Sequence, residues 1–177
     1  MKISYLVTVH NETLELLQLI EKLKTHIDAV APNDEVVILD DFSDNEDTNK
    51  ILSKAKSYGF TVVQHELKKN FSEHKNYGSK RCVGDFVCQI DADEYLFPNL
   101  LNNIHEIIES NPTVELYRVP RVNIVRGMTE KDVTMWGWNL SILPENNPII
   151  ETIIDDASEE YAFLKKNNLI ISEEIAG

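Results

Sequence analysis

Three groups of oxygen-bearing side chains follow short apolar runs that have the character of buried strands. The groups are Thr8, His10, Asn11 and Glu12, then Asp40, Asp41 and Ser43, then Asp91, Asp93 and Glu94. Carboxylates that are packed together repel one another, and burying them is costly unless a cation compensates them. Hard oxygen ligands of this kind suit Mg²⁺ or Mn²⁺ that holds a phosphorylated ligand.

An alternative interpretation makes these acids helix caps and turn formers. It suits Asp44 and Asp47, which lie in a polar turn before a predicted helix. It suits the third group poorly, because the acids Asp91, Asp93 and Glu94 directly follow a buried strand. The functional interpretation is therefore preferred for this group.

The elements that must position these groups follow from the spacing of the apolar residues. The predicted strands are 3–9, 35–40, 60–64, 85–90 and 114–119, and the predicted helices are 13–28, 47–57, 73–82 and 98–109. Strands that alternate with helices favour an α/β fold with a mainly parallel sheet covered on both faces. Ligands of open α/β sheets bind beyond the carboxyl ends of the strands, so we expect the three groups to share one edge.

The remainder of the chain carries weaker patterns. VNIV at 122–125 is compatible with a strand, and 157–167 with a helix. The length of 177 residues fits one domain, and we expect a single domain over 1–177.

Composition and charge exclude several function classes. The net charge of −13 opposes general nucleic-acid binding through phosphates. The stretch 65–81 is locally basic, which suits an anionic small ligand or a solvated loop with no ligand. No apolar run approaches the length of a membrane span, and the start has no signal-peptide pattern. We therefore expect a cytoplasmic protein without a transmembrane segment.

Three longer motifs resemble a known family. VTVHNE at 7–12, VVILDDFSDN at 36–45 and NYGSKRCVGDFVCQIDADE at 76–94 are together similar to the GT-A glycosyltransferases, most of all to the family-2 type. The FSEHKN stretch followed by DADE is similar to bacterial surface-glycan enzymes and to phage-encoded transferases. The resemblance implies a three-layer α/β/α nucleotide-diphospho-sugar transferase sandwich. It also implies a nucleotide-sugar-binding part over 1–120 and a short or truncated acceptor part over 121–177.

The resemblance implies donor-binding roles for the first two groups. Thr8 matches the position where the first strand ends against the nucleoside, and Glu12 matches the acid of the family's N-E pair. Asp40 and Asp41 match the paired acids of the second strand, one of which reads the base in the family. Which of the two does so here stays open.

The resemblance also implies a phosphate and metal region. Asn76 and Arg81 fall in the segment that approaches the nucleotide and its phosphates. Asp91 and Asp93 match the DXD pair of the family. Asp93 is the preferred ligand of a divalent metal, Mn²⁺ or Mg²⁺. Asp91 is expected near the ribose, the diphosphate and the metal.

The implied activity is metal-assisted transfer of a hexosyl or related sugar, with inversion. The donor is a nucleotide diphosphate sugar, with a UDP-sugar as first choice, and the acceptor is a hydroxyl of a glycan or another molecule. A metal ion stabilises the charge of the departing diphosphate, and a general base activates the acceptor hydroxyl. The alternative is a truncated or degenerate module that binds nucleotide sugar without catalysis.

The base and the acceptor site have several interpretations. Asp155 and Asp156 are candidates for the base, although an acid-rich first turn of a helix needs no catalytic role. Trp136 and Trp138 are candidates for an acceptor platform, because aromatic faces suit the apolar faces of sugars. The same tryptophans would also serve to close a hydrophobic core.

Overall fold

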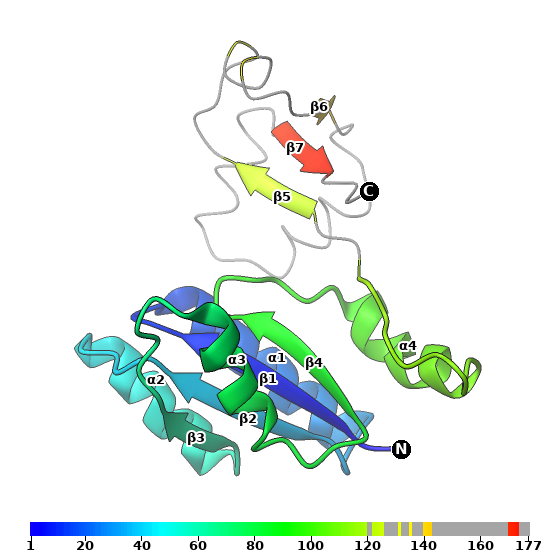
Figure 1. Cartoon of the computed structure of the whole chain (residues 1–177), viewed down its shortest axis with the longest axis horizontal. Coiled ribbons are helices and arrows are strands. Elements are labelled where there is room, and N and C mark those ends of the chain that lie inside the picture. The colour runs from blue at the N-terminus through cyan, green and yellow to red at the C-terminus, as the bar shows by residue number, and fades with distance from the viewer. Residues whose placement is uncertain (120–121, 126–130, 132–134, 136–139, 143–169, 174–177) are drawn as a thin grey trace. The chain divides into compact units, whose positions relative to one another are not determined.

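The computed structural model describes residues 1–119, 122–125, 131, 135, 140–142 and 170–173. The chain divides into two compact units, Met1–Pro112 and Thr113–Gly177. The first unit alternates strands and helices (Figure 1). Its elements are β1 (Ile3–Val9), α1 (Leu14–Ala29), β2 (Glu35–Asp40), α2 (Glu46–Ser57), β3 (Thr61–Gln64), α3 (Phe71–Ser79), β4 (Phe86–Asp91) and α4 (Pro98–Glu109).

Four parallel strands form the sheet of the first unit, in the order β3-β2-β1-β4. Helix α3 lies over one face of this sheet and α1 over the other (Figure 1). Parallel strands that are covered on both faces are apolar almost throughout. Strand β1 fits this rule, since Thr8 is its one residue that is not fully buried. The predicted α/β class with a parallel sheet is confirmed.

Helix α3 approaches the sheet closely. Leu6 of β1 forms a buried apolar cluster with Val37 and Leu39 of β2, and Tyr77 of α3 packs against this cluster. A Cβ atom added at Gly78 would lie 2.7 Å from Leu6 Cδ1. The missing side chain at Gly78 therefore lets α3 lie close to the sheet. This spacing sets how far the other residues of α3 lie from the strands.

Capping chemistry sets where the helices begin. The Asn45 side chain accepts hydrogen bonds from two backbone N–H groups in the first turn of α2. The Asn70 side chain accepts from the N–H of Glu73, so α3 begins at Phe71 instead of the predicted 73. Helix α4 begins with Pro98 in its first turn, as predicted. No helix in the described part of the chain combines the length and apolar character of a membrane span.

The predicted strand at 114–119 is wrong. The structure has no regular element over these residues. Leu116 is 86% exposed and Val119 is 51% exposed, so the apolar side chains that suggested a strand do not enter a core. A strand needs a hydrogen-bonded neighbour, and no described segment pairs with this one.

The second unit contains a small antiparallel sheet. Its strands are β5 (Val122–Val125), β6 (Leu140–Ile142) and β7 (Ile170–Glu173), in the order β5-β7-β6. The strand predicted for VNIV is thereby confirmed. The predicted helix at 157–167 lies outside the described residues. The division into a donor part and an acceptor part at 120 and 121 stays a prediction.

Gly84, just before β4, lies against the start of β1. Its N–H donates to Ser4 Oγ at 2.8 Å. A Cβ atom there would lie 2.6 Å from Ser4 Oγ, 2.7 Å from Ser4 N and 2.9 Å from Lys2 O. Because two of these atoms belong to the backbone, they cannot move aside as the end of a side chain can. Position 84 therefore requires glycine.

We expect Gly84→Ala to destabilise the fold by about 1–3 kcal/mol, the typical cost of overpacking. The measurement is the urea midpoint of unfolding, followed by far-UV circular dichroism. Val83→Ala is the matched control, since Val83 is 71% exposed and should tolerate truncation. Equal midpoints for Gly84→Ala and the wild type would contradict the close approach.

Candidate functional site

The polar groups after β1, β2 and β4 lie on neighbouring strands, as the sequence predicts. The register pairs Thr8 with Asp91 and Val9 with Asp40. The contact continues past the strand ends, because the Asp41 N–H donates to Val9 O at 2.9 Å. We name this end of the sheet the carboxyl edge. It is defined by Thr8, Asp40, Asp41, Asp91 and Asp93.

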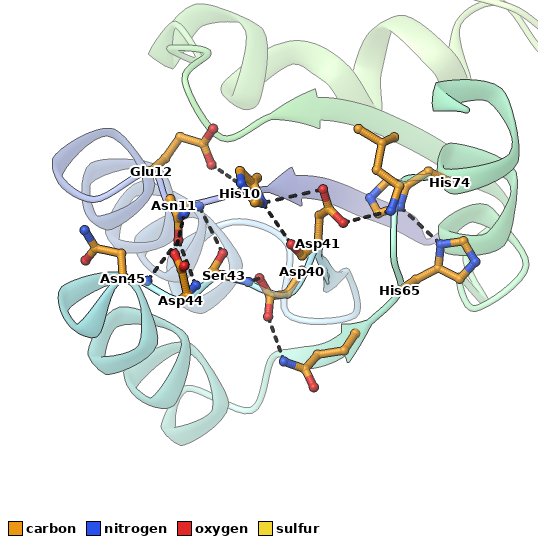
Figure 2. Close-up of polar contacts among 12 residues, drawn as sticks. His10, Asn11, Glu12, Asp40, Asp41, Ser43, Asp44, Asn45, His65 and His74 are labelled. Atoms are coloured by element: carbon orange, nitrogen blue, oxygen red, sulfur yellow. Dashed lines mark hydrogen bonds and ion pairs between the residues drawn. The ribbon is translucent and has the colours of Figure 1, made fainter. Parts of the chain in front are cut away.

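Asp40 and Asp41 have different surroundings (Figure 2). Asp40 is only 1% exposed, and its carboxylate accepts from the Ser43 N–H at 3.0 Å and from Gln64 Nε2 at 3.1 Å. Asp41 Oδ1 accepts from the Leu67 N–H at 2.7 Å, and the Asp41 side chain keeps 17% of its surface exposed. Asp40 therefore stabilises the turn after β2 through internal hydrogen bonds, whereas the Asp41 side chain reaches the surface.

His10 lies against Asp41 (Figure 2). Its Nδ1 atom is 2.8 Å from the Asp41 carbonyl oxygen and 3.5 Å from Asp41 Oδ2. The hydrogen bond to this carbonyl raises the pKa of His10, and the nearby carboxylates of Asp41, Glu12 and Asp44 add to the rise, while partial desolvation opposes it. The imidazole is therefore protonated to a greater extent than a free histidine at the same pH.

Asn11 joins the loop after β1 to the loop after β2 (Figure 2). Its Oδ1 atom accepts from the N–H groups of Asp44 and Asn45 at 2.9 and 3.0 Å. Its backbone has a φ of 67°, in the left-handed region that asparagine adopts more readily than most residues. Glu12, predicted in the donor site, turns its Oε2 back to the His10 N–H at 2.6 Å. Sequence reasoning counted Asn11 in the first polar group without a role of its own, and the structure shows that it links the two loops.

Asp91 connects β4 to β1 and α3. Thr8 Oγ1 donates to Asp91 Oδ1 at 2.6 Å, and Lys75 Nζ lies 2.8 Å from the same oxygen. The Asp91 N–H donates to Glu94 Oε2 at 2.9 Å. The lysine and aspartate side chains are 30% and 38% exposed, so solvent reaches the pair. Sequence reasoning counted Lys75 only within the basic stretch 65–81 and did not place it beside the DXD pair.

Asp93 is exposed in the turn after β4, and no hydrogen bond or ion pair is found for its side chain among the described residues. Together with Asp91 it offers carboxylate oxygens two residues apart along the chain. Mg²⁺ and similar ions are commonly held by one or two carboxylates, with substrate phosphates and waters as the other ligands. The chemistry of these two carboxylates therefore fits a divalent ion of the Mg²⁺ class.

Two histidines form a close pair between the end of β3 and α3. The Nδ1 atoms of His65 and His74 are 3.1 Å apart, and the His65 ring stacks on Tyr77 with 3.8 Å between centroids. Burial lowers the pKa of His74, and the charge of His65 lowers it further. His74 is 4% exposed, and its lowered pKa favours the uncharged imidazole. The buried ring packs α3 onto the sheet.

Asn76 and Arg81, both predicted near the nucleotide, lie on α3 and just after it. Asn76 lines a surface cleft of about 470 Å³ whose lining does not include the acids of the carboxyl edge. Arg81 Nη1 donates to the Tyr77 carbonyl at 2.9 Å, and the guanidinium lies 3.2 Å from the centroid of the Tyr77 ring. Lys75 is the cation that the structure places beside Asp91. The donor roles of Asn76 and Arg81 stay predictions.

The other predicted site residues lie outside the described residues. They are the candidate bases Asp155 and Asp156 and the candidate acceptor residues Trp136 and Trp138. Their roles stay predictions.

Comparison with known protein families gives a match over most of the chain. The model of the family described as glycosyl transferase family 2 matches residues 4–169. An uncharacterized glycosyltransferase of Haemophilus influenzae is 26% identical over 118 residues, which are 67% of this chain and 38% of that protein. An undecaprenyl-phosphate 4-deoxy-4-formamido-L-arabinose transferase of Enterobacter is 27% identical over 94 residues, which are 52% of this chain and 29% of that protein. The matches thus span well under half the length of these relatives.

Solved structures show the same fold. TarS of S. aureus is similar with a TM-score of 0.55 and 23% identity, over 86% of this chain and 27% of TarS. TarS 1–349 in complex with UDP-GlcNAc gives a TM-score of 0.53 and 23% identity, over 94% of this chain and 47% of that one. A mannosyltransferase from Pyrobaculum calidifontis in complex with GDP-Man and Mn²⁺ gives a TM-score of 0.50 and 22% sequence identity, over 63% of this chain and 33% of that one. The predicted GT-A architecture is confirmed.

Proposed function

We propose an activity for this chain, which belongs to glycosyltransferase family 2. The chain binds a nucleotide diphosphate sugar at the carboxyl edge and transfers the sugar to an acceptor hydroxyl. The observation that carries the proposal is that Asp41 follows β2 and Asp91 ends β4, the two strands on either side of β1, and that Lys75 of α3 lies 2.8 Å from Asp91. A UDP-sugar is the first choice of donor, in keeping with the UDP-GlcNAc complex of TarS. Transfer of a hexosyl or related sugar with inversion, and a cytoplasmic location, belong to the same proposal.

Lys75 supplies the positive charge that a diphosphate requires. Its ammonium group lies 2.8 Å from Asp91 Oδ1, and 30% of its side chain is exposed. A lysine is a compact point charge that changes partners easily. When the nucleotide binds, the ammonium group can contact a phosphate oxygen while Thr8 keeps hold of Asp91. The overall charge of −13 repels an anionic ligand, so a cation at the edge is needed to attract it.

Asp41 is our choice for the acid that reads the base. It is the member of the acidic pair whose side chain reaches the surface. Its carboxylate contacts the Leu67 N–H and His10. A carboxylate accepts hydrogen bonds, and the N3–H of uracil is a donor. Asp40, at 1% exposure, serves the fold instead. Thr8 and Glu12 support this region from β1 and the loop that follows it.

Asp93 and Asp91 would hold Mn²⁺ or Mg²⁺, which stabilises the charge that develops on the departing diphosphate. Asp93 is exposed and available to such an ion, whereas Asp91 is shared with Thr8 and Lys75. Asp93 is therefore the preferred ligand. The Mn²⁺ in the Pyrobaculum mannosyltransferase complex supports this choice of ion.

The acceptor side of the proposal rests on the sequence. Asp155 and Asp156 are proposed as candidates for the general base that takes the proton from the acceptor hydroxyl. Trp136 and Trp138 are proposed as the platform for an acceptor sugar.

The test is a thermal-shift panel of UDP, GDP, UDP-sugars and GDP-sugars, each with and without Mn²⁺. A nucleotide at about 100 times its dissociation constant adds about 2.7 kcal/mol of stability, which is about 5–10 °C in Tm for a chain of this size. We expect UDP and one UDP-sugar to give this shift only with Mn²⁺. Release of UDP from that sugar in the presence of an acceptor glycan then tests transfer.

Each outcome of the panel has a distinct meaning. A Mn²⁺-dependent shift followed by sugar transfer supports the enzyme. A shift without any transfer supports the alternative, a module that binds nucleotide sugar without catalysis. If none of the nucleotides shifts Tm, the proposed donor site at the carboxyl edge is overturned.

A further inference from the structure

A second cluster of ionisable side chains lies at the end of the sheet opposite the carboxyl edge. Asp34 immediately precedes β2, His26 lies in the last turn of α1, and His105 lies in α4. These three elements are separate in the sequence, and the fold brings them together. The donor site described above uses none of the three residues.

The three side chains are close enough to share one ion. One ring nitrogen of His26, one of His105 and a carboxylate oxygen of Asp34 all lie within 4.8 Å of one another. His105 Nε2 is 2.7 Å from Asp34 Oδ2, and the other oxygen, Oδ1, accepts from the Ile3 N–H at 2.9 Å. Asp34 is thus held in place from β1 while one of its oxygens faces the histidines.

His26 has an unsatisfied polar atom. It is 5% exposed, and its Nδ1 is buried with no hydrogen-bond partner. Its Nε2 lies 3.0 Å from the hydroxyl of Tyr5. Whichever tautomer His26 adopts, Nδ1 is left as either a buried donor or a buried acceptor without a partner. Such an atom costs free energy, and most buried polar groups avoid this cost. An incompletely satisfied imidazole that has one ring nitrogen within 4.8 Å of ligand atoms of Asp34 and His105 points to a missing ligand.

We propose that His26, Asp34 and His105 bind a divalent ion of the zinc class. Two imidazoles and one carboxylate form a ligand set that suits Zn²⁺, with a fourth position left for a water or a neighbouring oxygen. Mg²⁺ and Mn²⁺ prefer sites made of oxygens, so this cluster differs in kind from the DXD pair. The His105 side chain is 27% exposed, which gives the ion a route into an otherwise buried site. The bound ion joins α1, α4 and the start of β2.

The site differs from the other histidine pair of the chain. His65 and His74 are also close, but no carboxylate completes a group of three there within the described residues. This difference provides a matched control, because His65→Gln removes a histidine of a close pair without touching the proposed ligands.

The experiment uses the full chain, stripped of metal with EDTA and kept free of nucleotide. Free Zn²⁺ at about 100 times its dissociation constant should raise Tm by about 5–10 °C, and an excess of EDTA should reverse the rise. Co²⁺ should develop the visible absorption of a site with nitrogen ligands, and Zn²⁺ should bleach it. Mg²⁺ at the same concentration should produce no shift.

Variants separate this site from the rest of the molecule. His105→Gln changes the most exposed ligand and should keep the fold by circular dichroism while losing both the Zn²⁺ shift and the Co²⁺ spectrum. His65→Gln and Asp93→Ala should retain both signals, so the outcome does not depend on the donor site. A Zn²⁺ shift of equal size in His105→Gln, or no shift and no Co²⁺ spectrum in the wild type, would overturn the proposal and leave the cluster as a hydrogen-bond network.

Discussion

Asp93→Ala is expected to remove the Mn²⁺-dependent part of UDP binding while leaving the fold intact. Asp93 is exposed, and no described residue is hydrogen-bonded to or paired with its side chain, so truncation breaks no internal contact. If the ion is held by Asp93, Asp91 and the phosphates, loss of Asp93 should weaken the Mn²⁺-dependent affinity about 100-fold or more, which corresponds to about 2.7 kcal/mol. Isothermal titration with UDP, with and without Mn²⁺, measures this difference.

Asp28→Ala is the matched control for Asp93→Ala. Asp28 is another well-exposed aspartate, paired with Lys24 on the surface of α1, and its removal changes the net charge by the same amount. UDP affinity should be unchanged in this variant. An unchanged Mn²⁺-dependent affinity in Asp93→Ala would reject Asp93 as the metal ligand, even if UDP still bound to the edge.

The sequence was sufficient for the central sheet because each element carried a strong local pattern. The buried strand β1 and helix α4 have the predicted bounds, the latter because Pro98 fits the first turn of a helix. The short apolar stretch at 114–119 carried a similar signal and failed. A strand depends on a neighbour as well as on its own residues, and the sequence did not specify whether a neighbour was present.

The shared edge of the candidate groups was predictable for a topological reason. Parallel strands with helical connections bring their carboxyl ends to one edge, so the polar groups that follow β1, β2 and β4 lie at the same end of the sheet. The individual roles were not predictable in this way. Asp40 and Asp41 are adjacent in the sequence, and only the structure separates the buried acid from the one that reaches the surface.

Contacts that depend on the docking of helices were missed. Lys75 reaches Asp91 because Gly78 allows α3 to lie close to Leu6, and this distance is set by packing instead of spacing along the chain. The cluster of His26 and His105 with Asp34 was missed for the same reason, since the histidines show no common spacing in the sequence.

Asp40→Ala is expected to destabilise the fold by about 1–3 kcal/mol, the cost of leaving a buried polar group without its partner. The Asp40 carboxylate accepts from the Ser43 N–H at 3.0 Å and from Gln64 Nε2 at 3.1 Å, and it is 1% exposed. Gln64 is exposed and can turn to water, but the Ser43 N–H loses the acceptor that shapes the turn after β2. The urea midpoint of unfolding measures the loss.

Asp41→Ala serves as the counterpart of Asp40→Ala, because the two acids should divide stability and binding between them. Asp41→Ala should lower UDP affinity about 10-fold, or about 1.4 kcal/mol, if one hydrogen bond to the base is lost. Its effect on stability should be smaller than that of Asp40→Ala, since its side chain already reaches solvent. The reverse result, with Asp40→Ala stable but unable to bind UDP, would assign recognition of the uracil base to Asp40. It would then follow that the turn after β2 opens when the nucleotide binds, since Asp40 cannot reach a ligand while it is buried.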